Sequence, residues 1–273
     1  MTTFSLPLLA EPADLAARLG AEDLAIIDMR GAENYEKGHI PGALNINYAR
    51  IVRADPPVGG LLPAPAQLGE LLGSVGVSPG HHVVAYDDEG GGRASRLLWT
   101  LDVLGHERFS LLNGGLHAWV AEGHPLESGR VTPEPVDYPA SLGRPERTAD
   151  RDYILTRLGA ADFAALDVRS PAEYRGEDVR AGRGGHIPGA VNLDWVNAID
   201  QTRSLRFQPE PVLRNLLESR GITPDREVVV YCQTHHRSSH TYMVLRSLGY
   251  PRIRGYPGAW SEWGNDPTTP VES

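Results

Sequence analysis

The chain consists of two similar halves, and this duplication restricts the folds that it can adopt. Short motifs recur in the same order at a spacing of roughly half the chain. The matching segments are Ile27-Asp28-Met29-Arg30 with Leu166-Asp167-Val168-Arg169, Gly38-His39-Ile40-Pro41-Gly42-Ala43 with Gly185-His186-Ile187-Pro188-Gly189-Ala190, and Gly76-Val77-Ser78-Pro79 with Gly221-Ile222-Thr223-Pro224. A period this long does not suit a solenoid and indicates a duplicated domain.

Each half alternates short apolar runs with helix-like segments, which is typical of parallel β-α-β units. We expect strands at residues 24–28, 82–87, 109–112, 163–168, 228–232 and 252–254. We expect helices at residues 12–19, 64–72, 93–104, 116–122, 209–219 and 238–248. The predicted fold class is therefore α/β, with two domains that each contain an open, mainly parallel sheet and helices on both faces.

The length of 273 residues also favours two domains over one. Residues 124–150 are rich in Pro, Gly, Glu and Arg and have no periodicity, so this stretch is predicted to be a linker that wraps one domain onto the other. We place the first domain at residues 1–130, the linker at 131–147 and the second domain at 148–273.

Composition excludes several classes of protein. A single cysteine allows no intramolecular disulfide and no Cys-x2-Cys metal pair, and a working thiol suits the reducing cytoplasm. The net charge is −9 with scattered basic residues, so no nucleic-acid partner is expected. No stretch approaches the ~20 apolar residues of a membrane span, and the N-terminus lacks a signal-peptide pattern. We expect a soluble, cytoplasmic protein with no membrane partner.

The single cysteine, Cys232, ends the apolar run 228–231 and precedes the polar loop Gln-Thr-His-His-Arg. A free cysteine is also a common core residue. Here, however, the apolar pattern stops at the cysteine, and the carboxyl end of a parallel strand is where α/β sheets place ligands. Loop amides, the start of a helix near Ser238 and the charge of Arg237 all favour the thiolate. We therefore predict that Cys232 is a nucleophile and that Arg237 is its catalytic partner.

The matching loop of the first half has different chemistry. Tyr86-Asp87 aligns with Tyr231-Cys232, and Arg93 aligns with Arg237. The first loop is one residue longer, rich in glycine, and begins with Asp87, Asp88 and Glu89. Carboxylates there would repel an anion and no sulfur is present. The first half is predicted to be a catalytically silent copy that closes one wall of the active cleft.

These motifs together resemble rhodanese domains over nearly the whole chain. The resemblance is based on the motifs Asp-x-Arg and Gly-His-Ile-Pro-Gly-Ala, the cysteine loop that ends in arginine, and Trp260-Ser261-Glu262-Trp263. The loop 232–237 and the segment 255–265 resemble the azotobacter-type bacterial rhodanese in particular. The resemblance implies a thiosulfate sulfurtransferase that moves sulfur through a persulfide on Cys232 to cyanide or a thiol. It implies no metal and no organic cofactor.

The resemblance also suggests roles for the neighbouring residues. Backbone amides of the loop would hold the terminal sulfur, and Arg237 would offset the charge of the donor. The expected substrate-binding residues are Gln233, Thr234, His235, His236, Ser238, Arg169 and Trp195. Adjacent His235 and His236 are not both expected to face one small site. Arg169 with Asp167, like Arg30 with Asp28, is mainly interpreted as a strand-end pair that braces a loop, and His39 and His186 as structural.

Other chemistries are weighed against this one. Dual-specificity phosphatases of the same fold have a cysteine loop that is longer by one residue, so phosphatase activity and arsenate reduction rank low. A zinc site at Cys232, His235 and His240 ranks low because the metal would consume the thiolate. Relatives carry a substrate-binding arginine where this chain has Glu173, and Arg175 is a candidate replacement. Two alternatives stay open: a 3-mercaptopyruvate sulfurtransferase, and a persulfide carrier that delivers sulfur to a protein acceptor.

Overall fold

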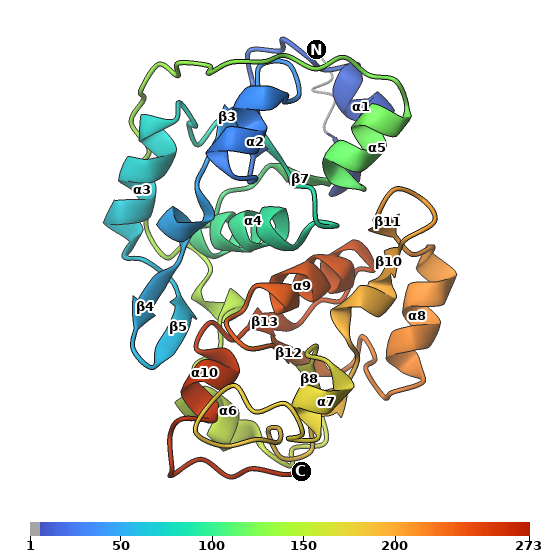
Figure 1. Cartoon of the computed structure of the whole chain (residues 1–273). Coiled ribbons are helices and arrows are strands. Elements are labelled where there is room, and N and C mark those ends of the chain that lie inside the picture. Colours follow the sequence, from blue (N-terminus) through green and yellow to red (C-terminus); the bar gives the residue numbers. More distant parts are fainter. Residues whose placement is uncertain (1–5) are drawn as a thin grey trace. The chain divides into compact units, whose positions relative to one another are not determined.

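The computed structural model describes residues 6–273, which form two compact units (Figure 1). The first unit comprises the chain up to Ile51 together with Pro63–Arg144 and Asp200–Phe207. The second comprises Val52–Leu62, Pro145–Ile199 and Gln208–Ser273. Residues 1–5, on which the missing signal-peptide pattern partly depends, lie outside the described residues.

Each half of the chain contributes one segment to the other unit. Val52–Leu62 belongs with the second unit, where the amide of Gly59 donates to Ser261 Oγ at 3.0 Å. Asp200–Phe207 belongs with the first unit, where Arg206 Nε donates to Glu11 at 2.9 Å. Domains drawn as continuous stretches of sequence do not include this exchange, because it depends on contacts between residues far apart in the chain.

The first unit is built on a five-stranded sheet in the order β1-β7-β6-β2-β3, in which all neighbours are parallel. The strands are β1 (Leu9–Ala10), β2 (Leu24–Asp28), β3 (Leu44–Asn45), β6 (His82–Tyr86) and β7 (Phe109–Leu112). The sheet is flanked by α1 (Pro12–Ala16), α2 (Ala32–Lys37), α3 (Pro65–Ser74), α4 (Gly92–Leu104) and α5 (Gly115–Ala121).

The second unit repeats this plan with a four-stranded parallel sheet in the order β13-β12-β8-β9. The strands are β8 (Phe163–Asp167), β9 (Val191–Asn192), β12 (Glu227–Tyr231) and β13 (Ile253–Gly255). The helices are α6 (Arg151–Arg157), α7 (Pro171–Tyr174), α8 (Glu210–Glu218), α9 (Arg237–Ser247) and α10 (Ala259–Trp263). The predicted α/β class, with two domains and parallel sheets, is confirmed.

Register brings the ends of two strands together at the site. Every residue of β8 and β12 is buried, and Asp167 lies opposite Tyr231. Cys232 and the Asp167-Val168-Arg169 turn therefore leave the sheet at the same edge. This is the carboxyl edge, where open α/β sheets bind ligands.

Smaller elements complete the chain. Two hairpins are formed by β4 (Arg53–Asp55) with β5 (Val58–Leu61) and by β10 (Ile199–Asp200) with β11 (Arg206–Phe207). Three 3-10 turns are η1 (Tyr48–Ile51), η2 (Pro145–Arg147) and η3 (Trp195–Ala198). The expected linker has no regular structure up to η2, and it contacts α3, where the amide of Val136 donates to the carbonyl of Gly73 at 3.0 Å.

The repeated motifs make the same contacts in both units. Tyr35 donates its hydroxyl to Ala43 and Tyr174 to Ala190, each at 2.7 Å. His39 stacks on Tyr35 and His186 on Tyr174, and each His ring bonds the backbone carbonyl of its tyrosine at 2.9 Å. These matching contacts fit the interpretation of the two histidines as structural.

Within residues 6–273, no helix is both long enough and apolar enough to cross a bilayer.

Candidate active site

Cys232 lies directly after β12, and α9 begins five residues later at Arg237. The loop between them, Cys232–His236, curls around the sulfur, and Cys232 is only 1% exposed. The hydroxyl of Ser238 in α9 and the amides of Thr234 and Ser238 hydrogen-bond the sulfur.

Carbonyl groups of the loop are engaged by other parts of the chain. The amide of Trp260 donates to the carbonyl of Cys232 at 2.9 Å, and the amide of Ser261 donates to that of Gln233 at 3.0 Å. Ser239 Oγ donates to the carbonyl of His235 at 2.6 Å. With these carbonyls held, the amides of Thr234 and Ser238 are free to hydrogen-bond the sulfur.

The charge state of the sulfur follows from opposing effects. Burial by itself raises the pKa of the Cys232 thiol. The positive charge of Arg237, the hydroxyl of Ser238 and the amides of Ser238 and Thr234 all lower this pKa, and together they outweigh burial. The pKa of Cys232 therefore lies below its ordinary value, which favours the nucleophilic thiolate.

A short chain of side chains leads to the sulfur. Ser238 Oγ donates to Cys232 Sγ at 3.5 Å, and His235 Nδ1 lies 2.7 Å from Ser238 Oγ. His235 is fully buried and has a positive φ of 55°. His236 is half-buried, and its ring lies 6.1 Å from that of Trp195. Of the two adjacent histidines, His235 thus contacts the hydroxyl that donates to the sulfur, and His236 lies near Trp195.

Arg237 is held by a carboxylate that lies 64 residues earlier in the chain. Its two terminal nitrogens donate to Glu173 at 2.7 and 2.8 Å, and Glu173 is itself 1% exposed. Burial opposes ionisation of Glu173, but hydrogen bonds and charge from Arg237, together with Ser170, lower the pKa of Glu173 to about 2. The positive charge of Arg237 thus acts on the sulfur from within an ion pair with Glu173.

Ser170 explains how α7 presents this carboxylate. Ser170 Oγ accepts from the amide of Glu173 at 3.2 Å, and Glu173 Oε2 accepts from the amide of Ser170 at 3.1 Å. This reciprocal pair is a capping box, and it fixes the first turn of the helix. The spacing Ser-Pro-Ala-Glu in the sequence is the signal that could have revealed it.

Arg169 and Trp195 have different surroundings. Arg169 is 1% exposed, donates to both carboxylate oxygens of Asp167 and to the carbonyl of Gly185, and lies 4.4 Å from the ring centre of Trp260. These contacts fit the expected bracing role of Arg169, and its contact with substrate stays a prediction. Trp195 is half-buried and packs edge-on against His240 at 5.3 Å.

Arg180 contacts both the cysteine loop and Glu173. Gln233 Nε2 donates to the carbonyl of Arg180 at 3.0 Å, and the guanidinium of Arg180 lies 3.8 Å from Glu173. Arg180 is 54% exposed on its side chain and also pairs with Asp178. Arg175, the candidate replacement in the sequence, pairs instead with Glu177 at 2.7 Å. Arg180 has no regular spacing from the motif, so no sequence pattern points to it.

The corresponding loop of the first unit already contains an anion of its own. Asp87 Oδ1 accepts from the amides of Glu89 at 3.0 Å and Gly91 at 2.8 Å, and Oδ2 accepts from Ala94 at 2.9 Å. Burial, and then the nearby Glu89, raise the pKa of Asp87. The carboxylate occupies the position that matches the sulfur, so this copy has neither a nucleophile nor a vacant anion cradle.

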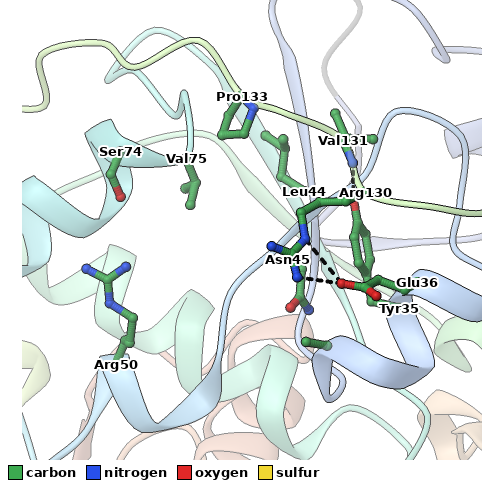
Figure 2. A pocket seen from close by; sticks show the side chains of 11 residues that line it. Tyr35, Glu36, Leu44, Asn45, Arg50, Ser74, Val75, Arg130, Val131 and Pro133 are labelled. Carbon is green, nitrogen blue, oxygen red and sulfur yellow. Dashed lines mark hydrogen bonds and ion pairs between the residues drawn. The ribbon is translucent and has the colours of Figure 1, made fainter.

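No group of three or more His, Cys, Asp or Glu side chains within residues 6–273 is arranged to hold a metal ion. A cavity of about 300 Å³ lies in the first unit (Figure 2). Its lining includes Tyr35, Asn45 and Arg50, with Arg130 paired to Glu36 at the rim. None of the predicted site residues lines it.

Comparison with known proteins agrees with this geometry. The Rhodanese-like domain family matches residues 11–122 and 150–266. The chain is 53% identical over 269 residues to a thiosulfate sulfurtransferase of Azotobacter vinelandii, with 98% of each chain covered. It is 50% identical over 274 residues to a thiosulfate sulfurtransferase of Pseudomonas aeruginosa, with 100% of each covered.

Two more distant matches extend the comparison. The sulfur carrier protein TtuD of Thermus thermophilus is 37% identical over 87% of this chain and 86% of its own. The anaerobic ergothioneine biosynthesis enzyme of Chlorobium limicola shares the fold with a TM-score of 0.84 at 24% identity, over 97% of this chain and 70% of that one. With the domain matched twice and full-length relatives at this identity, the chain belongs to the rhodanese family.

Proposed function

We propose that this protein is a thiosulfate sulfurtransferase that carries sulfur as a persulfide on Cys232. The observation that carries the proposal is the buried Cys232 thiol, whose pKa is lowered by amides, Ser238 and Arg237. The Azotobacter and Pseudomonas relatives, named thiosulfate sulfurtransferases, support the choice of donor.

The first half-reaction loads the enzyme. The Cys232 thiolate attacks the outer sulfur of thiosulfate and forms a new S–S bond, while the S–S bond of thiosulfate breaks and its electron pair leaves on sulfite. The amides that contact the sulfur, from Thr234 and Ser238, then stabilise the negative persulfide. Arg237 supplies positive charge beside them, and Glu173 fixes its position.

In the second half-reaction, cyanide or a thiol takes the terminal sulfur and the S–S bond breaks with return of its electron pair to Cys232. Cyanide leaves as thiocyanate, and a thiol leaves as its own persulfide. Since the two half-reactions share one covalent intermediate, ping-pong kinetics are expected. The work requires a reduced thiol, and we place it in the cytoplasm, without a metal or organic cofactor.

Replacing the nucleophile tests this proposal. Mass spectrometry of the wild-type protein after incubation with thiosulfate should show a gain of one sulfur atom at Cys232, and added cyanide should remove it as thiocyanate. Cys232→Ser should show neither the gain of sulfur nor the release of thiocyanate, and its circular dichroism spectrum should match that of the wild type. Asp88→Ser, in the matching loop of the first unit, is the control and should keep both. Sulfur transfer that persists in Cys232→Ser would refute the mechanism.

A persulfide carrier is the second candidate, because the Thermus relative is named a sulfur carrier protein. Both candidates load Cys232, but a carrier would release sulfur slowly to cyanide and rapidly to a protein thiol. Comparing loading by thiosulfate with loading by 3-mercaptopyruvate separates the thiosulfate enzyme from the mercaptopyruvate alternative.

A further inference from the structure

We propose that the β4–β5 hairpin, which the first half of the chain contributes to the second unit, is a positioning element for the catalytic loop. This inference rests on the proposed function and assigns a residue-level role to part of the half that lacks a nucleophile. It is carried by the contact of Gly60 with Thr234 and by the contacts of Ser261 with both the hairpin and the loop.

Gly60, in β5, touches the backbone of the loop. It has a positive φ of 77°, and a methyl group added at its Cα would overlap the carbonyl oxygen of Thr234 and lie 2.6 Å from the carbonyl carbon. A methyl group on neighbouring Gly59 would lie 3.2 Å from Thr234 Cγ2. The Gly59-Gly60 pair therefore permits an approach of hairpin to loop that no other residue type allows at Gly60.

This approach fixes the direction of one peptide group. In a trans peptide the carbonyl and the following amide point in opposite directions, so the carbonyl of Thr234 against the hairpin directs the amide of His235 away from it. His235 has a positive φ of 55°, an uncommon conformation for a residue other than glycine, and it needs support from its surroundings. The hairpin provides that support next to Thr234, whose own amide bonds the sulfur.

Ser261 joins the two elements. Its amide donates to the carbonyl of Gln233 at 3.0 Å, which holds the loop. Its hydroxyl accepts from the amide of Gly59 at 3.0 Å and lies 3.2 Å from the carbonyl of Gly59, which holds the hairpin. Ser261, in the middle of α10, thus binds both hairpin and loop, while the carbonyl of Gln233 is held by its amide and that of Thr234 lies against Gly60.

The test is Gly60→Ala in the full-length protein, with Gly159→Ala as the matched control. Gly159 has the same φ of 77° but nothing within 4 Å of an added methyl group, so it reports the backbone strain alone. Gly60→Ala should slow single-turnover sulfur uptake from thiosulfate about 10- to 100-fold, the scale expected for displacement of a reacting group. It should also raise the thiol pKa, measured by ultraviolet absorbance of the only thiolate in the chain. Gly159→Ala should leave both quantities at wild-type values.

The readouts separate this inference from the proposed function. If the wild-type protein takes no sulfur from thiosulfate, the proposed function fails, whereas the thiol pKa still tests the hairpin. An unchanged pKa and uptake rate in Gly60→Ala, or equal changes in Gly159→Ala, would overturn the positioning role.

Should Gly60→Ala fail to fold, Ser261→Ala provides the second test, because it removes the hydroxyl tether without adding bulk. It should slow sulfur uptake about 3- to 10-fold, as expected for one hydrogen bond, and raise the thiol pKa in the same direction. Wild-type behaviour of Ser261→Ala would then reject the hairpin as a positioning element.

Discussion

At the scale of single residues, reactivity depends on the balance between burial of the Cys232 sulfur and the groups that contact it. Burial favours the neutral thiol, and Arg237, Ser238 and two backbone amides favour the thiolate. Arg237 acts from a fixed position because Glu173 binds both of its terminal nitrogens. Ser238 and Glu173 should therefore shift the thiol pKa in opposite directions when they are altered.

Ser238→Ala should raise the thiol pKa, because the thiolate loses the hydrogen bond that the Ser238 hydroxyl donates to it. Sulfur uptake in the wild type should fall as the pH drops through the lowered pKa, and in the variant this fall should begin at a higher pH. Rapid-mixing measurement of uptake across the pH range checks both statements. Ser247→Ala is the control, because Ser247 lies on the same helix and its hydroxyl donates to the backbone carbonyl of Val244. If the midpoint pH of sulfur uptake in Ser238→Ala equals that of the wild type, this hydrogen bond does not lower the thiol pKa.

Glu173→Gln should lower the thiol pKa further, because Arg237 then acts without an opposing carboxylate. It should also destabilise the fold by about 3 kcal/mol, since a largely buried guanidinium loses its partner. The pKa of Glu173 is lowered from 4.5 to about 2, so its stabilising effect is complete above pH 4.5 and is lost as the pH falls toward 2. Urea unfolding at pH 7 and pH 3 should show a smaller difference between the two proteins at pH 3. Equal differences at the two pH values would contradict this account of the ion pair.

At the scale of elements, the same strand-loop-helix unit is used twice with different contents. In the second unit the loop after β12 surrounds a sulfur, and in the first unit the loop after β6 surrounds the carboxylate of Asp87. An internal carboxylate that accepts three amides satisfies the loop without any ligand. The first loop is thus a structural version of the same anion cradle.

Asp87→Ala should lower the free energy of unfolding by about 3 kcal/mol, because it leaves the buried amides of Gly91 and Ala94, and the partly buried amide of Glu89, without an acceptor. The thiol pKa and the rate of sulfur uptake at Cys232 should stay within about twofold of wild type. Denaturant unfolding and single-turnover uptake measure the two effects. A large loss of uptake in a folded Asp87→Ala protein would show that the first loop has a direct part in the chemistry.

Elements also show what the sequence could reveal. Strands such as β2 and β7 match the expected bounds because buried parallel strands are continuous apolar runs, and α4 and α9 are long enough to show a helical period. Helices such as α7 and α10 are too short for a period to appear. The loop after β12 was predictable because it is continuous in sequence. The Glu173 ion pair and the hairpin contact join residues 64 and 202 positions apart, and no local pattern encodes such contacts.

At the scale of the whole molecule, duplication allows one structural device to be compared in the unit that contains Cys232 and in the unit that has no cysteine. Asp28 binds Arg30 and Asp167 binds Arg169, each with a shortest contact of 2.6 Å, and all four residues are buried. The copies differ in what lies beside them. Both arginines lie near a strand-end tyrosine, with Arg30 5.9 Å from the ring centre of Tyr86 and Arg169 5.8 Å from that of Tyr231, but Arg169 also lies over Trp260, whose amide holds the carbonyl of Cys232.

The pair of variants Asp28→Asn and Asp167→Asn should therefore share one effect and differ in another. Each leaves a buried arginine without its carboxylate, so each should lower the free energy of unfolding by about 3–5 kcal/mol. Only Asp167→Asn should also slow sulfur uptake, because displacement of Arg169 disturbs Trp260 and through it the loop carbonyl that Trp260 holds. Unfolding curves and single-turnover uptake on both variants make the comparison. Equal uptake rates in the two variants would mean that the Asp167–Arg169 pair of the second unit supports the fold alone, and that the Cys232 loop keeps its geometry without this pair.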